Sequence, residues 1–532
     1  DLKAIMCVVS YFKTTDERSS HWKTKNYRVF YMKLRRKRVK PIALDDVTII
    51  DDARLRKAIT AASLGNAMEW FDFGVYGFVA YALGKVFFPG ADPGVQMIAA
   101  LATFSVPFLI RPLGGLFFGA LGDKYGRQKI LSITIIIMSL STFAIGLIPS
   151  YATIGIWAPV LLLLAKMAQG FSVGGEYTGA SIFVAEYSPD RKRGFMGSWL
   201  DFGSIAGFVL GAGVVVLISA IIGEAKFLDW GWRIPFFLAL PLGVIGLYLR
   251  HALEETPAFQ QHVEKLEQGD REGLREGPKV SFKEIATKHW RSLLACIGLV
   301  IATNVTYYML LTYMPSYLSH NLHYSEDHGV LIIIAIMIGM LFVQPVMGLL
   351  SDRFGRRPFV IIGSIALMVF AIPCFMMINS GVLGLIFAGL LILAVILNSF
   401  TGVMASTLPA MFPTHIRYSA LASAFNISVL IAGLTPTVAA WLVESSGDLY
   451  MPAYYLMVVA VVGLTTGIMM KETANKPLRG ATPAASDLAE AKEILQEHHD
   501  NIEQKIEDIN DEIEQLEQKR KHLINQHPSI NE

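Results

Sequence analysis

The sequence is dominated by apolar runs that reach or exceed the ~20 residues that an α-helix needs to cross a bilayer core of ~30 Å. Hydrophobic residues make up 53% of the chain and the mean hydropathy is +0.45, which excludes an ordinary water-soluble core. Because lipid offers backbone groups no partners, such runs must be helical. The twelve runs lie at about 58–88, 96–121, 130–149, 155–185, 194–222, 232–251, 290–318, 328–350, 358–378, 382–411, 418–443 and 452–470.

A short loop motif repeats between runs in the two halves of the chain. Residues 119–129 read GALGDKYGRQK, and residues 348–357 read GLLSDRFGRR. Each copy offers a glycine for close helix approach, an Asp and basic residues for pairing at a helix end, and a glycine for a tight turn. The repeat predicts two six-helix halves, at 58–251 and 290–471, joined by a polar cytoplasmic linker at 252–289.

Lys and Arg gather in the loops after runs two, four, eight and ten, and are missing from the loops after runs one, three, seven, nine and eleven. The basic side of such proteins is cytoplasmic, so both termini are expected there. The segment 1–57 includes a basic stretch at 32–40 that suits a topology anchor better than a nucleic-acid site. Met32 is the expected natural start, which would make 1–31 a non-native extension, although a disordered native extension stays open.

The last segment, 472–532, carries a charged heptad pattern that predicts a short cytoplasmic coiled coil and a homodimer formed through it. Lys492 and Arg520 stand at positions that a coil buries, so the association is expected to be weak; a solvated single helix is the alternative. The apolar residues of the repeat are Leu488, Leu495, Ile502, Ile506, Ile509, Ile513, Leu516 and Leu523.

Five further signatures resemble those of the metabolite:proton symporter family of the major facilitator superfamily; they lie at 110–115, 169–177, 186–194, 231–236 and 254–259. The heptad tail is similar to that of the family's osmoregulatory members, which import proline and glycine betaine. Relatives that carry citrate, shikimate or 2-oxoglutarate generally lack such a tail. The resemblance covers 33–532 and implies the twelve-helix facilitator fold in a bacterial inner membrane.

Ionisable residues inside a bilayer are costly, so each is a candidate for function. They concentrate in the first half, and the proton-coupling candidates are Glu69, Asp72 and Glu176. Burial and a nearby base can together set a carboxyl group to exchange protons near neutral pH. Fixed ion pairs between helices are the competing interpretation.

Neutral polar groups and aromatic faces suit a substrate whose own charges cancel, and Tyr rings with Trp70 suit a quaternary ammonium group. Arg111 suits a carboxylate. Packing or an interfacial belt is the alternative role for the aromatic residues. The predicted substrate-binding residues are Trp70, Tyr76, Arg111, Lys166, Gln169, Asn304, Tyr307, Tyr308 and Asn398.

The two motif loops predict a cytoplasmic gate. Asp123 with Arg127, and Asp352 with Arg356, are expected to lock helix ends in the outward-open state and to part in the inward-open state. A simple staple at each helix end is compatible with the same residues.

These patterns favour a secondary transporter that imports zwitterionic osmolytes with protons and responds to osmolality. A proton symporter of a carboxylate metabolite, with Arg111 and Lys166 as anion ligands, is one alternative; a solute sensor that does not transport is another. We expect no enzyme, metal or cofactor, since the sequence offers no nucleotide loop, metal cluster or nucleophile constellation and a proton gradient would supply the energy.

Overall fold

The computed structural model describes residues 43–44, 47–90, 92–125, 127–251, 287–322, 326–414, 416–497, 500 and 518 of the 532. Residues 48–494 form one compact unit, which is described below. Residues 1–47 and 495–532 group as a second unit, nearly all of it outside the described part. The predicted linker at 252–289 also lies outside the described residues up to 286.

The first half of the helical unit is built on α3, the longest helix that the structure describes. The α3 helix begins six residues before the predicted run because the Asp51 side chain accepts a hydrogen bond from the Ala53 N–H at 2.9 Å. The helices of this half are α3 (Asp52–Phe87), α4 (Pro93–Tyr125), α5 (Arg127–Leu147), α6 (Tyr151–Ile154), α7 (Trp157–Ser172), α8 (Glu176–Tyr187), η2 (Asp190–Lys192), α9 (Arg193–Ile222), α10 (Glu224–Asp229), η3 (Gly231–Arg233), α11 (Ile234–Phe237) and α12 (Ala239–His251).

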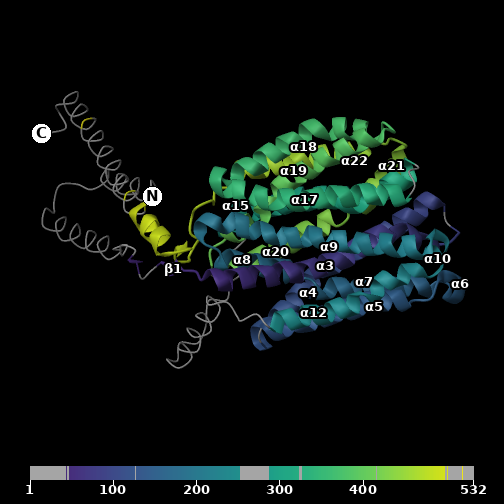
Figure 1. Cartoon of the computed structure of the whole chain (residues 1–532), viewed down its shortest axis with the longest axis horizontal. Coiled ribbons are helices and arrows are strands. Elements are labelled where there is room, and N and C mark those ends of the chain that lie inside the picture. Colours follow the sequence, from purple (N-terminus) through teal and green to yellow (C-terminus); the bar gives the residue numbers. More distant parts are fainter. Residues whose placement is uncertain are drawn as a thin grey trace, which may run out of the picture. The chain divides into compact units, whose positions relative to one another are not determined.

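The second half packs against the first mainly through α17 on α9, and the helices of both halves run side by side (Figure 1). The first apolar run of this half, the seventh of the chain, is continuous but contains two π-helical turns, η4 and η5. The helices are α15 (Trp290–Tyr308), η4 (Met309–Tyr313), α16 (Met314–Ser316), η5 (Tyr317–Asn321), α17 (Glu326–Phe354), α18 (Arg356–Ile378), α19 (Leu383–Ala410), α20 (Arg417–Ala432), α21 (Thr435–Ser446) and α22 (Met451–Met469).

Within the described residues, each of the twelve predicted runs lies on one helix or on consecutive helical segments. Ten spans in this part of the chain are long and apolar enough to cross a membrane. The two remaining runs lie on α3, which carries Glu69 and Asp72, and on α5, whose apolar part at Ser132–Leu147 is shorter. The predicted all-α membrane fold is confirmed.

Runs four and eleven, each predicted as one helix, are broken, and the first of these breaks explains the glycines of two signatures. A gap at 173–175 separates α7 from α8 where they cross α4. A Cβ atom on Gly115 would lie 2.9 Å from the Gly174 carbonyl oxygen, so the two backbones touch only because both residues are glycine. Asn426 of α20 donates to the same Gly174 carbonyl at 2.8 Å. The second break separates α20 from α21 at 433–434.

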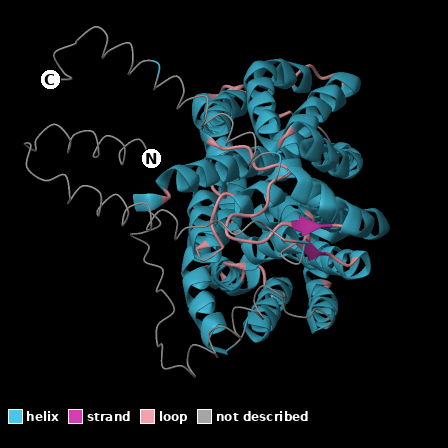
Figure 2. Ribbon diagram, turned by 90° about the vertical axis from the view of Figure 1, so that its left-hand side faces the viewer, coloured by secondary structure: helices cyan, strands magenta, loops and turns pink. Residues whose placement is uncertain are grey.

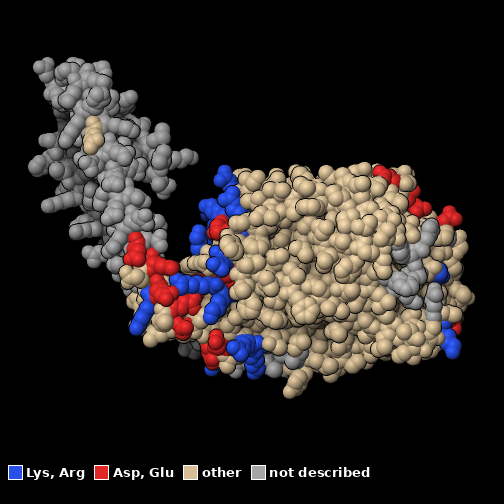
Figure 3. Space-filling model, turned by 45° about the horizontal axis from the view of Figure 1, so that its top comes forward, with Lys and Arg blue, Asp and Glu red and all other residues tan. Residues whose placement is uncertain are grey.

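Charged residues collect at the end of the bundle where α3 and α9 begin and α17 ends, while the sides seen in Figure 3 are almost free of charge. We call it the basic end. The two short strands β1 (Thr48–Ile49) and β2 (Ala484–Ala485) pair in parallel across the helix ends there (Figure 2). The basic residues at this end include Arg191, Lys192, Arg193, Arg353, Arg356, Arg357 and Arg417.

Candidate functional site

The polar stripe of α3 lies in the interior of the bundle. Asn66, Glu69, Asp72 and Tyr76 are each at most 3% exposed, as a helix surrounded by other helices requires. Each member of the stripe contacts a different neighbour. The Asn66 amide donates to the Leu200 carbonyl at 2.7 Å and to Ser204 Oγ at 2.6 Å, so this end of the stripe is fixed to α9.

Glu69 and Arg111 form a buried ion pair between α3 and α4. Arg111 Nη2 lies 3.2 Å from Glu69 Oε1, and both side chains are buried. The Arg111 guanidinium also lies over the Phe425 ring of α20, 5.6 Å from its centroid, which brings a second-half residue to the pair. Arg111 Nε is buried without a hydrogen-bond partner in the described structure, so the guanidinium keeps a donor for another acceptor.

Asp72 belongs to a separate hydrogen-bonded chain. Lys166 Nζ donates to Gln169 Oε1 at 2.7 Å, Gln169 Nε2 donates to Thr142 Oγ1 at 3.0 Å, and Thr142 Oγ1 donates to Asp72 Oδ2 at 2.8 Å. Among the described residues, no Lys or Arg lies within 4.0 Å of the Asp72 carboxylate. Two neutral side chains, Gln169 and Thr142, therefore link the Lys166 ammonium group to Asp72 by hydrogen bonds.

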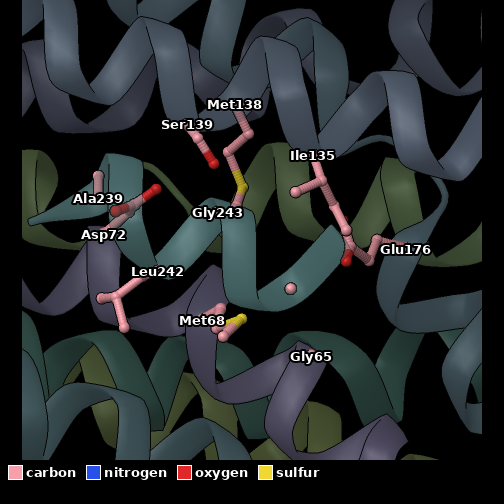
Figure 4. Close-up of a pocket in the computed structure, with 11 residues that line it drawn as sticks. Gly65, Met68, Asp72, Ile135, Met138, Ser139, Glu176, Ala239, Leu242 and Gly243 are labelled. Carbon is pink, nitrogen blue, oxygen red and sulfur yellow. The ribbon is translucent and has the colours of Figure 1, made fainter. Parts of the chain in front are cut away.

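Asp72 also lines a pocket between α3, α5 and α12 (Figure 4). Glu176, the first residue of α8, lines the same pocket, so two of the three proton-coupling candidates share one space. The remaining walls are mostly apolar, with Met68, Met138 and Leu242 among them. Such a wall offers the two carboxylates few polar partners.

Aromatic rings from both halves meet close to the Glu69–Arg111 pair. The Trp70 ring lies 5.0 Å from the Tyr307 ring and 6.2 Å from the Tyr308 ring, centroid to centroid. Asn66 Oδ1 accepts the Trp70 indole N–H at 3.1 Å, which fixes the indole orientation. Tyr308 also contacts Phe108, one helical turn before Arg111 on α4, at 5.2 Å. The structure therefore brings Trp70, Tyr307 and Tyr308 together, next to the buried ion pair.

Three other predicted substrate-binding residues, Tyr76, Asn304 and Asn398, form hydrogen bonds with backbone carbonyl groups. The Tyr76 hydroxyl donates to the Ala100 carbonyl at 3.2 Å, and its ring lies 4.2 Å from Lys166 Nζ, which assigns Tyr76 to the Lys166 chain. The Asn304 amide donates to the Val300 carbonyl of its own helix at 3.1 Å. The Asn398 amide donates to the Met340 carbonyl of α17 at 2.9 Å, although Asn398 Oδ1 is buried without a partner among described residues.

Two site residues do not follow from the sequence pattern. Thr142 carries no charge, yet it joins Asp72 to Gln169. Tyr177 donates to the Asp201 carboxylate at 3.1 Å and stacks on Phe425, with ring centroids 4.9 Å apart and planes at 17°. The Asp201 charge within α9 was visible in the sequence, but its tyrosine partner was not.

The second motif loop joins the two halves at the basic end. Asp352 accepts the Gly194 and Phe195 backbone N–H groups at 2.7 and 2.8 Å, so a second-half carboxylate caps the first turn of α9. Arg356 Nη2 lies 3.7 Å from Asp352 Oδ1. Gly348 lets α17 approach α9, since its Cβ would lie 2.7 Å from the Gly194 carbonyl oxygen. Gly355 makes the turn between α17 and α18 with φ of +94°.

A further ion pair crosses between the halves close by. Arg417 Nη1 of α20 lies 2.7 Å from Glu186 Oε1 of α8. The side chains of Asp123 and Arg127 in the first motif loop lie outside the described part of the chain, and so do the coiled-coil residues Ile502, Ile506, Ile509, Ile513, Leu516, Arg520 and Leu523.

A bundle of apolar helices with two halves meeting at buried polar groups defines a multi-pass membrane transporter. Residues 57–485 match the sequence model of the sugar (and other) transporter family, and the chain belongs to this family. Residues 486–531 match the osmosensory transporter coiled coil, over the segment where the heptad pattern predicts a coil.

The relatives agree with this family. The proline/betaine transporter of Salmonella typhimurium is 87% identical over 94% of this chain and 100% of its own length. The glycine betaine/proline/ectoine/pipecolic acid transporter of Dickeya dadantii is 86% identical over the same shares. A proton:xylose symporter bound to a glucose analogue superposes with a TM-score of 0.65 at 19% identity, covering 80% of this chain and 98% of that structure, which shows the shared fold.

Proposed function

We propose that this protein imports zwitterionic osmolytes, such as proline and glycine betaine, together with protons, and that osmolality controls its activity. The observation that carries the proposal is the meeting of Trp70, Tyr307 and Tyr308 beside the buried Arg111. Aromatic faces bind a quaternary ammonium group, and a guanidinium binds a carboxylate, so the two ends of a betaine find complementary groups. The substrates named for the relatives are zwitterions of this kind.

The ionisable groups divide between two tasks. Glu69 is paired with Arg111, so its charge is compensated and it is suited to fixing the guanidinium at the substrate site. Asp72 accepts a hydrogen bond from a neutral hydroxyl group and lines a largely apolar pocket. We therefore assign proton coupling to Asp72, with Glu176 as the second candidate. The proton gradient is the energy source in this scheme, and no cofactor takes part.

The proposed orientation places the basic end in the cytoplasm of a bacterial inner membrane, with both termini on that side. The gathering of Lys and Arg at this end supports it. The tail is proposed to form a weak homodimer through its heptads, whose basic residues at buried positions make association sensitive to salt.

Uptake by purified protein in proteoliposomes tests this function. Radiolabelled betaine and proline should accumulate only under an imposed inward proton gradient, while citrate should not accumulate. Accumulation of citrate in their place would favour the carboxylate symporter. Binding of betaine without any uptake would favour the sensor.

The aromatic site has its own test. Trp70→Leu removes the ring and should raise the KM for betaine about 5- to 30-fold, as loss of one desolvated cation–π contact of about 1–2 kcal/mol implies. Trp441→Leu is the matched control, because Trp441 is 56% exposed on the outside of the bundle. An unchanged KM in the Trp70→Leu variant would place the ammonium group elsewhere.

A further inference from the structure

A segment that follows α22 crosses the basic end of the bundle and touches both halves. We call residues 471–485 the strap. It ends in strand β2, and two residues separate this strand from a helix that begins at residue 488. In Figure 2 loops and the two strands lie over the helix ends at this face. The strap forms specific hydrogen bonds with buried and half-buried groups of the bundle, so it is an ordered part of the fold.

The first part of the strap is anchored on the second half. The Glu472 carboxylate accepts the Arg356 and Arg357 backbone N–H groups at 3.0 Å each and thereby caps α18. Burial acts to raise the pKa of Glu472, but backbone N–H donors from Arg356, Ala474, Arg357 and Thr473 outweigh it and lower that pKa. Glu472 is therefore charged at neutral pH, and this anchor is retained there.

Asp352 connects the strap to the contact between the halves. Its backbone carbonyl accepts the Asn475 amide at 3.1 Å, while its side chain caps α9. Asn475 has φ of +55°, a left-handed conformation that asparagine tolerates, so the chain turns sharply at this contact. Further along, the Arg479 carbonyl accepts the Thr414 N–H at 3.0 Å and Arg417 Nη2 at 3.1 Å.

The later part of the strap is anchored on the first half. The Ala484 N–H donates to Asp190 Oδ2 at 3.1 Å, and Asp190 also pairs with Arg193. Strand β2 pairs with β1, which lies just before α3, and Thr482 Oγ1 lies 3.2 Å from Thr48 Oγ1. Arg193 Nη1 donates to the Lys476 carbonyl at 2.9 Å, which ties the first half to the strap at its crossing point.

The two anchors limit how far the halves can part. The chain from Arg479 to Ala484 spans five residue steps, and its full extension is about 17 Å. While both anchors persist, the halves cannot separate at the basic end beyond that reach. The Arg193 contact tightens this limit, because it joins the halves four residues after Glu472.

We propose that the strap is a latch that closes the basic end, that it must leave the first half before this end opens, and that the tail controls transport by stabilising or releasing it. This inference rests on the proposed function for its regulatory meaning. The tail helix begins with a cap, in which Asp487 Oδ1 accepts the Glu490 N–H at 2.8 Å, only two residues after β2. In this proposal, a change in tail association is transmitted along the chain to the β1–β2 anchor.

A disulfide across the anchor tests the latch. In a background in which Cys7, Cys296 and Cys374 are replaced by Ala, the pair Thr48→Cys and Thr482→Cys should form a disulfide under oxidation, since the two hydroxyls lie 3.2 Å apart. The readout is hydrogen–deuterium exchange of the Gly194 and Phe195 amides in nanodiscs. These amides are covered by Asp352 when the basic end is closed.

Oxidation should slow exchange of these two amides and lower betaine uptake, each at least tenfold, and reduction should restore both. A control pair, Ser364→Cys with Gly463→Cys, joins α18 to α22 within one half, where a Cβ on Gly463 lies 3.5 Å from the Ser364 Cβ. That disulfide should leave the exchange unchanged. Unchanged exchange in the fully crosslinked Thr48–Thr482 pair would overturn the latch.

A variant that loosens the strap should have the opposite effect on amide exchange. Glu472→Ala removes the acceptor that caps α18 and should accelerate exchange of the Gly194 and Phe195 amides at least threefold. Unchanged exchange would also contradict the latch. Amide exchange needs no substrate, so it tests the latch independently of transport. If the reduced protein transports neither betaine nor proline, that result counts only against the proposed function.

Discussion

The substitution Asp352→Asn tests whether the motif loop works as a gate. The Asp352 carboxylate accepts two backbone N–H groups from the other half, at 2.7 and 2.8 Å. Each hydrogen bond to a charged group contributes about 1.5–3 kcal/mol, and the charge also interacts favourably with the N-terminus of α9. Asparagine keeps one acceptor oxygen, so the variant loses one such bond and the charge.

The loss should therefore destabilise the closed state of the basic end by about 1.5–3 kcal/mol, which lowers the ratio of closed to open states by roughly 10- to 150-fold. Opening of the opposite end requires a closed basic end in an alternating-access transporter, so its population should fall by a similar factor. Thr312→Cys is a suitable reporter, because Thr312 is buried against Gly77 of the other half.

The assay is the rate at which a membrane-impermeant maleimide, added from the side opposite to the basic end, labels the reporter. Asp352→Asn should slow labelling severalfold or more. Asp448→Asn is the control, because Asp448 accepts the Tyr450 N–H at 2.8 Å within a single loop of one half. If both variants label at the rate of the unmodified protein, Asp352 is only a staple at a helix end. The same treatment of Asp123 tests the first motif loop.

Three further predictions concern coupling, the ion pair and the tail. Asp72→Asn should abolish betaine accumulation under a proton gradient but retain betaine exchange, measured by counterflow; retained accumulation would move the proton site to Glu176. Glu69→Gln leaves a buried guanidinium without its charge partner and should cost about 3–5 kcal/mol of stability, seen as a lower thermal unfolding midpoint. Adding Arg111→Met should recover part of this loss. Equal midpoints for the unmodified protein and Glu69→Gln would contradict a stabilising ion pair. Arg520→Ile should strengthen tail association and deletion of 488–532 should remove it, so the osmolality of half-maximal uptake should move in opposite directions; unchanged values despite altered crosslinking would place sensing in the membrane helices.

The sequence predicted the helices well because bilayer thickness imposes a length on each apolar run. It predicted the roles of the second motif glycines for a similar reason, since close approach at Gly348 and the turn at Gly355 leave no alternative residue. The breaks at 173–175 and 433–434 were missed because apolar periodicity does not report a local contact such as Gly115 against Gly174.

The site was predicted only in part. Charged residues in apolar runs pointed to Glu69, Asp72 and Arg111, because burial of charge is costly wherever it occurs. Which carboxylate pairs with Arg111 depends on helix rotation, and the neutral Thr142 that bridges Asp72 and Gln169 gave no signal. The strap gave no signal in the sequence, since backbone acceptors such as the Lys476 carbonyl leave no trace in side-chain composition.

Proton movement during betaine uptake tests the central proposal most directly. Proteoliposomes in weak buffer, without an imposed gradient, should take up protons when betaine is added outside, and the external pH should rise. The rise should be missing with Asp72→Asn while betaine still equilibrates across the membrane. Betaine entry by the unmodified protein without any change in external pH would contradict proton coupling.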